Sequence, residues 1–347
     1  MSNNKREYYP NLNGMKALAC IGIIIMHIAA NQKYAVPPIL NRVIVSMDDL
    51  VYLFMIISAF GISVGYAHKL TSGTMDYFYF YKRRYQKLWP FFTFLILISL
   101  ILDHRSVAIA EGLIETSMLF GFLPNNNLDI VGVGWTVGVI FVFYFTFPVF
   151  IALLQNRIST LLSVLYCVLS PYLLQAYFLT SPFVVKNFQV RHTFIFCIPF
   201  FVAGCLIYKH RQMMISVWNK HPRILGTIFL LAIAIYYFTP AMIGQIPLYV
   251  YKVLLVFILF LWYAISRCHV WLSNPFVNYL GSISMEMYLA QMVVFRLLQR
   301  LNLVYVFGKT FIGLLAVTIV ECVGLVFFIV ITRSVYKRVK FILQAEP

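Results

Sequence analysis

The stretch MKALACIGIIIMHIAA, Met15 to Ala30, decides the fold class, because it belongs to an apolar run long enough to cross a bilayer as a helix. Two of its residues, Lys16 and His27, are ionisable. They stand 11 positions apart, close to three helical turns, so they share one helix face at an axial separation of about 16 Å. Ionisable residues in a span normally face the bundle interior or a water-filled cavity. The stretch therefore predicts a first span with a functional face.

The rest of the chain has the same apolar character. Its 347 residues are 62% hydrophobic and 11% charged, with a mean hydropathy of +0.85, far from the balance of a soluble protein. Each span must be helical, because lipid offers no partner for backbone N–H and C=O groups. We expect an all-α integral membrane protein, a single domain over residues 1–347 with no separate soluble domain. The apolar runs predict about ten transmembrane helices in one bundle, at residues 12–31, 49–67, 88–102, 133–154, 158–179, 193–208, 224–239, 247–265, 275–297 and 311–332.

The basic residues lie in short clusters between the apolar runs. The formal charge of +16 does not indicate nucleic acid, because the clusters do not form one basic, aromatic-rich surface along the sequence. The positive-inside rule explains them better and places both termini in the cytoplasm. The six cysteines show no CxxC pair and no metal-ligand spacing, so no metal site is predicted. We expect a multi-pass protein of the plasma (inner) membrane, and we leave a homodimer open.

Lys16 and His27 each allow two interpretations. Lys16, near the cytoplasmic end of its span, either snorkels to the lipid headgroups or faces the interior. His27 lies past the middle of the helix, toward the outer leaflet. Its imidazole is suited to accept a proton from a hydroxyl or to carry an acyl group, and a structural hydrogen bond to a neighbouring helix is the alternative.

A second group of candidates lies in the connection HKLTSGTMDYFYFYKRRYQKLWP, His68 to Pro90. Four cations, Lys82, Arg83, Arg84 and Lys87, stand just before the third predicted span, among several aromatic residues. Such a group suits a phosphate-rich ligand with an aromatic base. Membrane topology alone also places cations at this position.

These residues resemble a known family. The segment NLNGMKALACIGIIIMH is similar to the opening of the acyltransferase type 3 family of integral membrane O-acyltransferases, with Lys16 where that family usually has Arg and with His27 matched. Further similar segments follow in family order up to about residue 292: LFMIISAFGISVGY with Ser58, KRRYQKLWP with Arg84, GWTVGVIFVFYFTFPVF with Trp135 and Tyr144, CIPFFVAGCLIY, and YLGSISMEMYLAQ with Tyr288.

The resemblance implies a reaction and a set of site residues. The family transfers acyl groups, usually acetyl, from cytoplasmic acyl-CoA to carbohydrate hydroxyls on or beyond the outer face. It implies that acyl-CoA contacts Lys16, Arg83, Arg84 and Lys87, with His27 near the reactive carbonyl. A glycan or lipid-linked sugar acceptor is then expected near Ser58, Trp135, Tyr144, Tyr288 and Gln291. Outside the motifs, Arg191 and His192 suit an anionic or sugar ligand, or serve as an interfacial anchor.

The sequence also departs from the family. Ile140 and Phe141 stand where the family has paired glutamates, and Gln291 replaces a histidine. Candidates for the missing acid are Asp48, Asp49 and Glu286, so the predicted catalytic set is His27 with Asp49 and Glu286. Glu321 is a further buried acid, with an interhelix anchor as its simpler role.

The missing glutamates keep two other functions open. One is a transporter that exports a polysaccharide or lipid-linked sugar and has lost the acyl-transfer chemistry, although no inverted repeat is visible. The other is a non-catalytic membrane subunit of a polysaccharide synthase. The main prediction remains an acyl-CoA-dependent O-acyltransferase acting on a cell-surface or envelope glycan.

Overall fold

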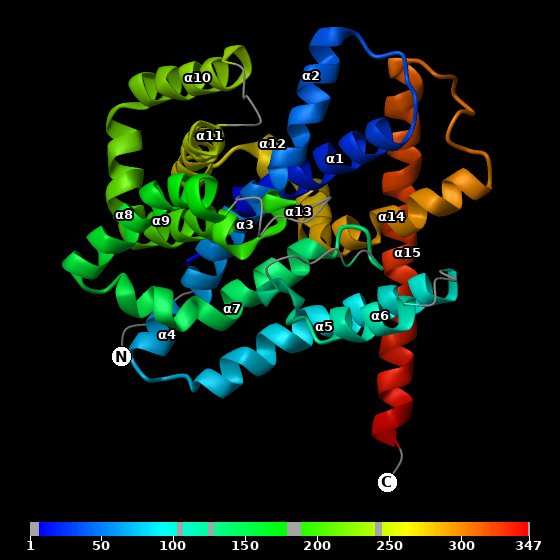
Figure 1. The fold of residues 1–347 in the computed structure, drawn as a ribbon, viewed down its shortest axis with the longest axis horizontal. Helices are drawn as coiled ribbons and strands as arrows, with labels where there is room; N and C mark the ends of the chain where they lie inside the picture. Colours follow the sequence, from blue (N-terminus) through cyan, green and yellow to red (C-terminus); the bar gives the residue numbers. More distant parts are fainter. Residues whose placement is uncertain are drawn as a thin grey trace.

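The structure is a computed structural model that describes residues 7–102, 107–123, 128, 130–178, 189–239 and 245–345. Within these ranges the chain is helical and forms no strand, apart from an isolated bridge between Ala35 and Thr310 (Figure 1). The helices in chain order are α1 Asn11–Asn31, α2 Pro38–Ser46, η1 Met47–Asp49, α3 Leu50–Ile62, η2 Ser63–Ala67, α4 His68–Thr71, α5 Tyr77–Leu102, α6 Ala108–Thr116, η3 Phe120–Phe122, α7 Trp135–Leu153, α8 Arg157–Leu173, η4 Leu174–Phe178, η5 Val190–His192, α9 Phe194–Lys220, α10 Pro222–Phe238, α11 Ile246–Ser266, α12 Val270–Ser273, α13 Pro275–Ser282, α14 Ser284–Arg300 and α15 Phe311–Ala345.

Seven of the described helical segments are long and apolar enough to cross a membrane. They are α1, Pro38–Thr71, α7, Arg157–Phe178, α9, α11 and the Phe311–Arg338 part of α15. The protein is therefore an all-α, multi-pass membrane protein. The predicted spans at 88–102, 224–239 and 275–297 correspond to α5, α10 and α13–α14, which do not meet this criterion; α10, for example, has only 17 residues. The ten-span count and the cytoplasmic position of both termini stay predictions.

The predicted span at 275–297 is two helices rather than one, divided at Ile283. Ile283 leaves the helical conformation, with φ −108° and ψ 5°. Because the span is divided, α13 packs against the start of α1, and α14 packs against α15. Gly281 makes the close approach possible, because a Cβ there would lie 2.0 Å from the carbonyl oxygen of Asn13.

Helix α1 is central in the bundle. It contacts α3, α11, α13, α14 and α15 (Figure 1). At its start, the fully buried Asn11 side chain donates to the carbonyl oxygens of Ala264 and Arg267 and accepts from the backbone N–H of His269 at 3.1 Å. The first turn of α1 and the end of α11 therefore lie on the same side of the bundle, as the predicted topology requires.

Large apolar side chains cover the outside of the bundle. Leu161 on α8 is 68% exposed, and Phe327 on α15 is also 68% exposed. Figure 1 shows α15 along one side of the molecule, with its C-terminal half extending past the other helices. In water such a surface would drive aggregation, so these faces are the ones that contact lipid.

We predict that Gly281→Ala lowers the stability of the protein by about 1–3 kcal/mol, because the new methyl group must push α13 away from α1. Gly226→Ala is the matched control, since a Cβ on this α10 glycine meets nothing within 4 Å. Thermal unfolding of the two variants in detergent gives the measurement. Equal melting temperatures for both would show that the α1–α13 contact is not a tight one.

Candidate active site

A cavity of about 460 Å³ lies between the first turns of α1 and α14, and we call it the inner cavity. Residues of five further helices, α3, α5, α7, α13 and α15, also line it, so no single segment defines it. Its lining residues are Asn13, Lys16, Phe54, Ser58, Lys87, Leu88, Phe91, Tyr144, Gly281, Ser282, Ser284, Met285, Glu286, Leu289 and Arg333. The structure thus brings together five of the residues that the sequence predicted for the site: Lys16, Ser58, Lys87, Tyr144 and Glu286.

The inner cavity carries an excess of positive charge. Arg333 on α15 forms an ion pair with Glu286 on α14, so these two charges balance. Lys16 and Lys87 have no carboxylate partner among the described residues. Two positive charges therefore remain in the lining, which favours an anionic ligand.

Arg84 lies next to Tyr144, one of the residues that line the inner cavity. Its Nη2 donates to the Tyr66 hydroxyl at 2.5 Å, and its guanidinium lies 4.5 Å from the centre of the Tyr66 ring and 5.8 Å from that of Tyr144. Tyr66 belongs to the π-helical turn η2, a local irregularity often found at functional sites. Arg83, in contrast, is exposed over the Tyr79 ring and does not line the inner cavity.

A constriction closes the outward end of the inner cavity. Phe54 and Met285 line both the inner cavity and a second, apolar space of about 10 Å³. This small space is completed by Val51, Thr136, Ile140 and Tyr288. Ile140, which replaces one of the family's expected glutamates, therefore faces an apolar gap, and Phe141 packs edge-on against Tyr85 at 5.5 Å. No carboxylate lines this constriction within the described residues.

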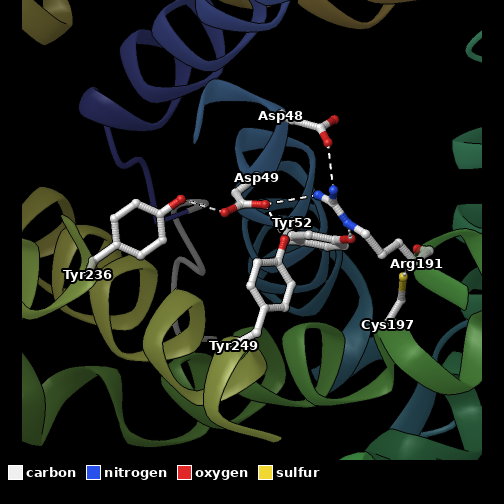
Figure 2. Close-up of polar contacts among 7 residues, drawn as sticks. All are labelled: Asp48, Asp49, Tyr52, Arg191, Cys197, Tyr236 and Tyr249. Atoms are coloured by element: carbon white, nitrogen blue, oxygen red, sulfur yellow. Dashed lines mark hydrogen bonds and ion pairs between the residues drawn. The ribbon is translucent and has the colours of Figure 1, made fainter. Parts of the chain in front are cut away.

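On the other side of the constriction, six residues form a polar network that we call the outer cluster: Asp48, Asp49, Tyr52, Arg191, Tyr236 and Tyr249 (Figure 2). Arg191, the middle residue of η5, donates to Asp48 at 2.7 Å, to Asp49 at 2.9 Å and to the Tyr52 hydroxyl at 3.0 Å. The hydroxyls of Tyr236 and Tyr249 both donate to Asp49. Every oxygen of the Asp49 carboxylate is thus bound, and Asp49 is a structural acceptor in this state.

His192 stacks on Trp135 beside the outer cluster. The two rings are 4.0 Å apart and nearly parallel, at 10°. Burial, together with the neighbouring Arg191 charge, lowers the pKa of His192 to about 4, so the imidazole is neutral near pH 7. A neutral ring stacked on an indole offers a flat apolar face with a hydrogen-bonding edge, which suits a sugar ring.

His27 lies in the C-terminal half of α1 and is partly buried. It lines neither the inner cavity nor the constriction. Its backbone carbonyl accepts from the Asn31 side chain at 2.9 Å, and the Asp48 carboxylate acts on its imidazole electrostatically. Among the acids of the outer cluster it is thus Asp48 that acts on His27, which lies three turns from Lys16.

The two remaining motif residues are buried in α14. Gln291 is fully buried and donates to the backbone carbonyl of Tyr288 at 2.9 Å, while its side-chain oxygen has no donor among the described residues. Tyr288 faces the constriction. No group of three His, Cys, Asp or Glu residues that could hold a metal occurs in the part of the chain that the structure describes.

Three residues of the site were not predicted from the sequence: Lys252, Tyr236 and Tyr249. Lys252 on α11 is buried and donates to the carbonyl of Thr239 at 2.6 Å, near Tyr236. It is a lone cation in an apolar run, IPLYVYKVLLVF, so the rule that singled out Lys16 applies to it equally. Tyr236 and Tyr249 carried no such signal.

Comparisons with known proteins agree with the resemblance. Residues 9–333, nearly the whole chain, match a family model described as an acyltransferase domain, that of acyltransferase type 3. Searches among curated proteins and among solved structures return no match.

We predict that Asp49→Asn destabilises the protein more than Asp48→Asn, by on the order of 2 kcal/mol. Asp49 is buried and accepts from Arg191, Tyr236 and Tyr249, whereas Asp48 is more exposed and accepts from Arg191 alone among the described contacts. Thermal unfolding in detergent compares the two variants. If Asp48→Asn were the more damaging change, Asp49 would not be the centre of the network.

Proposed function

The chain belongs to the acyltransferase type 3 family, and from that membership we propose that it moves an acyl group, acetyl in the first instance, from acyl-CoA to a hydroxyl of a cell-surface or envelope glycan. The observation that carries this proposal is the inner cavity with Lys16 and Lys87, which have no carboxylate partner among the described residues. Acyl-CoA is a polyanion at its nucleotide end, and charge-assisted hydrogen bonds to phosphate are among the strongest polar contacts in proteins.

The inner cavity suits such a donor in size and chemistry. Its volume of about 460 Å³ lies within the usual range of small-molecule sites. Lys16 and Lys87 bind phosphate oxygens, and the hydroxyls of Ser58 and Tyr144 offer neutral hydrogen bonds further in. Bound acyl-CoA supplies the activated thioester, and these residues of the chain bind and orient it.

The outer cluster and the Trp135–His192 stack suit the acceptor. Carbohydrates bind through flat aromatic faces and through charged or polar groups that reach their hydroxyls. Arg191, Asp48 and the exposed edge of His192 supply these groups on the same side as His27. A glycan or a lipid-linked sugar arriving from the outer face would meet them first.

His27 acts on the acceptor hydroxyl in one of two ways. As a general base, it takes the hydroxyl proton while the oxygen attacks the acyl carbonyl and the thiolate leaves. As a nucleophile, it first takes the acyl group itself and then passes it to the hydroxyl. The first route gives sequential kinetics and the second gives ping-pong kinetics.

The acidic residue that assists His27 in this proposal is Asp48. Asp49 and Glu286, the acids predicted beside His27, are each bound to an arginine, Arg191 and Arg333. Asp48 also pairs with Arg191, but its side chain is 40% exposed, against 8% for Asp49 and 23% for Glu286. Asp48 is therefore the most accessible of the three carboxylates, and it is the one that acts on the His27 imidazole.

We predict that His27→Gln abolishes the acylation of the surface glycan and leaves its export normal. Mass spectrometry of the glycan from parent and variant cells measures both. His221→Gln, the same change at an exposed histidine, serves as the control and should leave both unchanged. Loss of export, in cells whose glycan never carried an acyl ester, would favour the transporter over the acyltransferase.

We predict that Lys87→Ala weakens the binding of coenzyme A to the purified protein about tenfold, the effect of losing one charge-assisted hydrogen bond. Arg83→Ala, one turn away on α5 and outside the inner cavity, should change binding less than about twofold. Isothermal titration with coenzyme A and acetyl-CoA gives the dissociation constants. Equal weakening by both changes would assign the effect to general surface charge, and no binding by the parent protein would exclude acyl-CoA as the donor.

A further inference from the structure

A second cavity, of about 280 Å³, lies between α4, α7 and α9, and we call it the α9 cavity. Its floor is apolar, with Ala67, Ile151 and Leu154, and its rim carries His68, Lys209 and Arg211. None of its lining residues lines the inner cavity. Figure 1 shows α4 and α7 close to each other.

The rim has one positive charge in excess. Arg211 forms a two-point ion pair with Glu7, at 2.6 Å and 2.9 Å, and these hydrogen bonds from Arg211 lower the pKa of the Glu7 carboxyl, which is therefore ionised and neutralises Arg211. Lys209 donates only to a neutral acceptor among the described residues, the Thr160 hydroxyl, at 3.0 Å. The charge of Lys209 is therefore left over.

The α9 cavity adjoins a lipid-facing surface. Thr160 belongs to the first turn of α8, and its hydroxyl also donates to the carbonyl of Leu154 on the cavity floor at 3.2 Å. On the same helix, Ile158 is 69% exposed and Leu161 is 68% exposed. A ligand whose polar part occupies the cavity can therefore lay an apolar part along α8 without crossing water.

We propose that the α9 cavity binds the headgroup of an anionic phospholipid, with the phosphodiester on Lys209 and His68 and the acyl chains along α8. A phosphodiester carries one negative charge, which matches the single charge left over at the rim. The volume is at the lower end of small-molecule sites, enough for a headgroup and small for a complete nucleotide. Basic pockets between membrane helices bind phospholipid headgroups by this chemistry.

The test compares Lys209→Glu with Lys220→Glu in the full chain. Both variants change the same charge on α9, but Lys220 lies at the exposed end of the helix, outside the cavity. The purified proteins are equilibrated with equal amounts of phosphatidylglycerol and phosphatidylcholine, and retained lipid is counted by native mass spectrometry. We expect Lys209→Glu to retain at least fivefold less phosphatidylglycerol, and Lys220→Glu to stay within twofold of the parent. Lys209→Gln gives the same comparison if the glutamate variant does not fold.

Three outcomes overturn the proposal. Undiminished retention by the Lys209 variants would show that the rim does not hold the lipid. An equal loss in Lys220→Glu would show that only general surface charge attracts it. The third outcome concerns glycerophosphoglycerol, which carries the phosphodiester without acyl chains. If it binds as tightly as phosphatidylglycerol, the site takes a soluble anion. None of these outcomes bears on coenzyme A binding in the inner cavity.

Discussion

The carboxylate of Asp49 is the group on which the outer half of the bundle depends. It lies at the junction of η1 and α3 and accepts from Arg191 before α9, from Tyr236 on α10 and from Tyr249 on α11. A buried ion is costly unless its partners satisfy it, and here the partners come from elements far apart in the chain. The same contacts that neutralise the charge therefore fix the positions of these helices. Removing the acid would leave a half-buried guanidinium with Asp48 alone.

The outer cluster, the constriction and the inner cavity follow one another along two helices, α3 and α7. Along α3, Asp49 belongs to the outer cluster, Phe54 to the constriction and Ser58 to the inner cavity, over about 14 Å of axial rise. Helix α7 repeats the order with Trp135, Ile140 and Tyr144. The two helices thus present three levels in register: a polar outer level, an apolar middle and a cationic inner level. That arrangement suits the proposed reaction, in which a charged donor and a neutral, hydroxyl-rich acceptor bind at opposite ends.

The sequence predicted the helical class and singled out Lys16 and His27 as ionisable groups in an apolar run, but it passed over Lys252, to which the same rule applies. Lys16 and His27 stood out because helical periodicity is local. Tyr236 and Tyr249 did not, since their partner Asp49 lies 187 and 200 positions away and the chain has 23 tyrosines. The break at Ile283 was also missed: it lies beside Gly281, whose close neighbour Asn13 is on a helix at the other end of the sequence. The replacement of the expected glutamates by Ile140 and Phe141 was visible, but its consequence, an apolar constriction, depended on which residues face the gap.

The constriction bears directly on the proposed reaction. A space of about 10 Å³ holds at most one water molecule, so neither an acyl group nor a sugar hydroxyl meets the other in this state. The residues that separate the two levels are Phe54 and Met285, and the unbranched Met side chain has three rotatable bonds and adapts easily to new neighbours. A rotation of Met285 would join the two spaces without moving a helix, because its neighbour Glu286 is held by Arg333. The ion pair at the inner end thus links α14 to α15 beside the side chain whose rotation would join the two spaces in the proposed reaction.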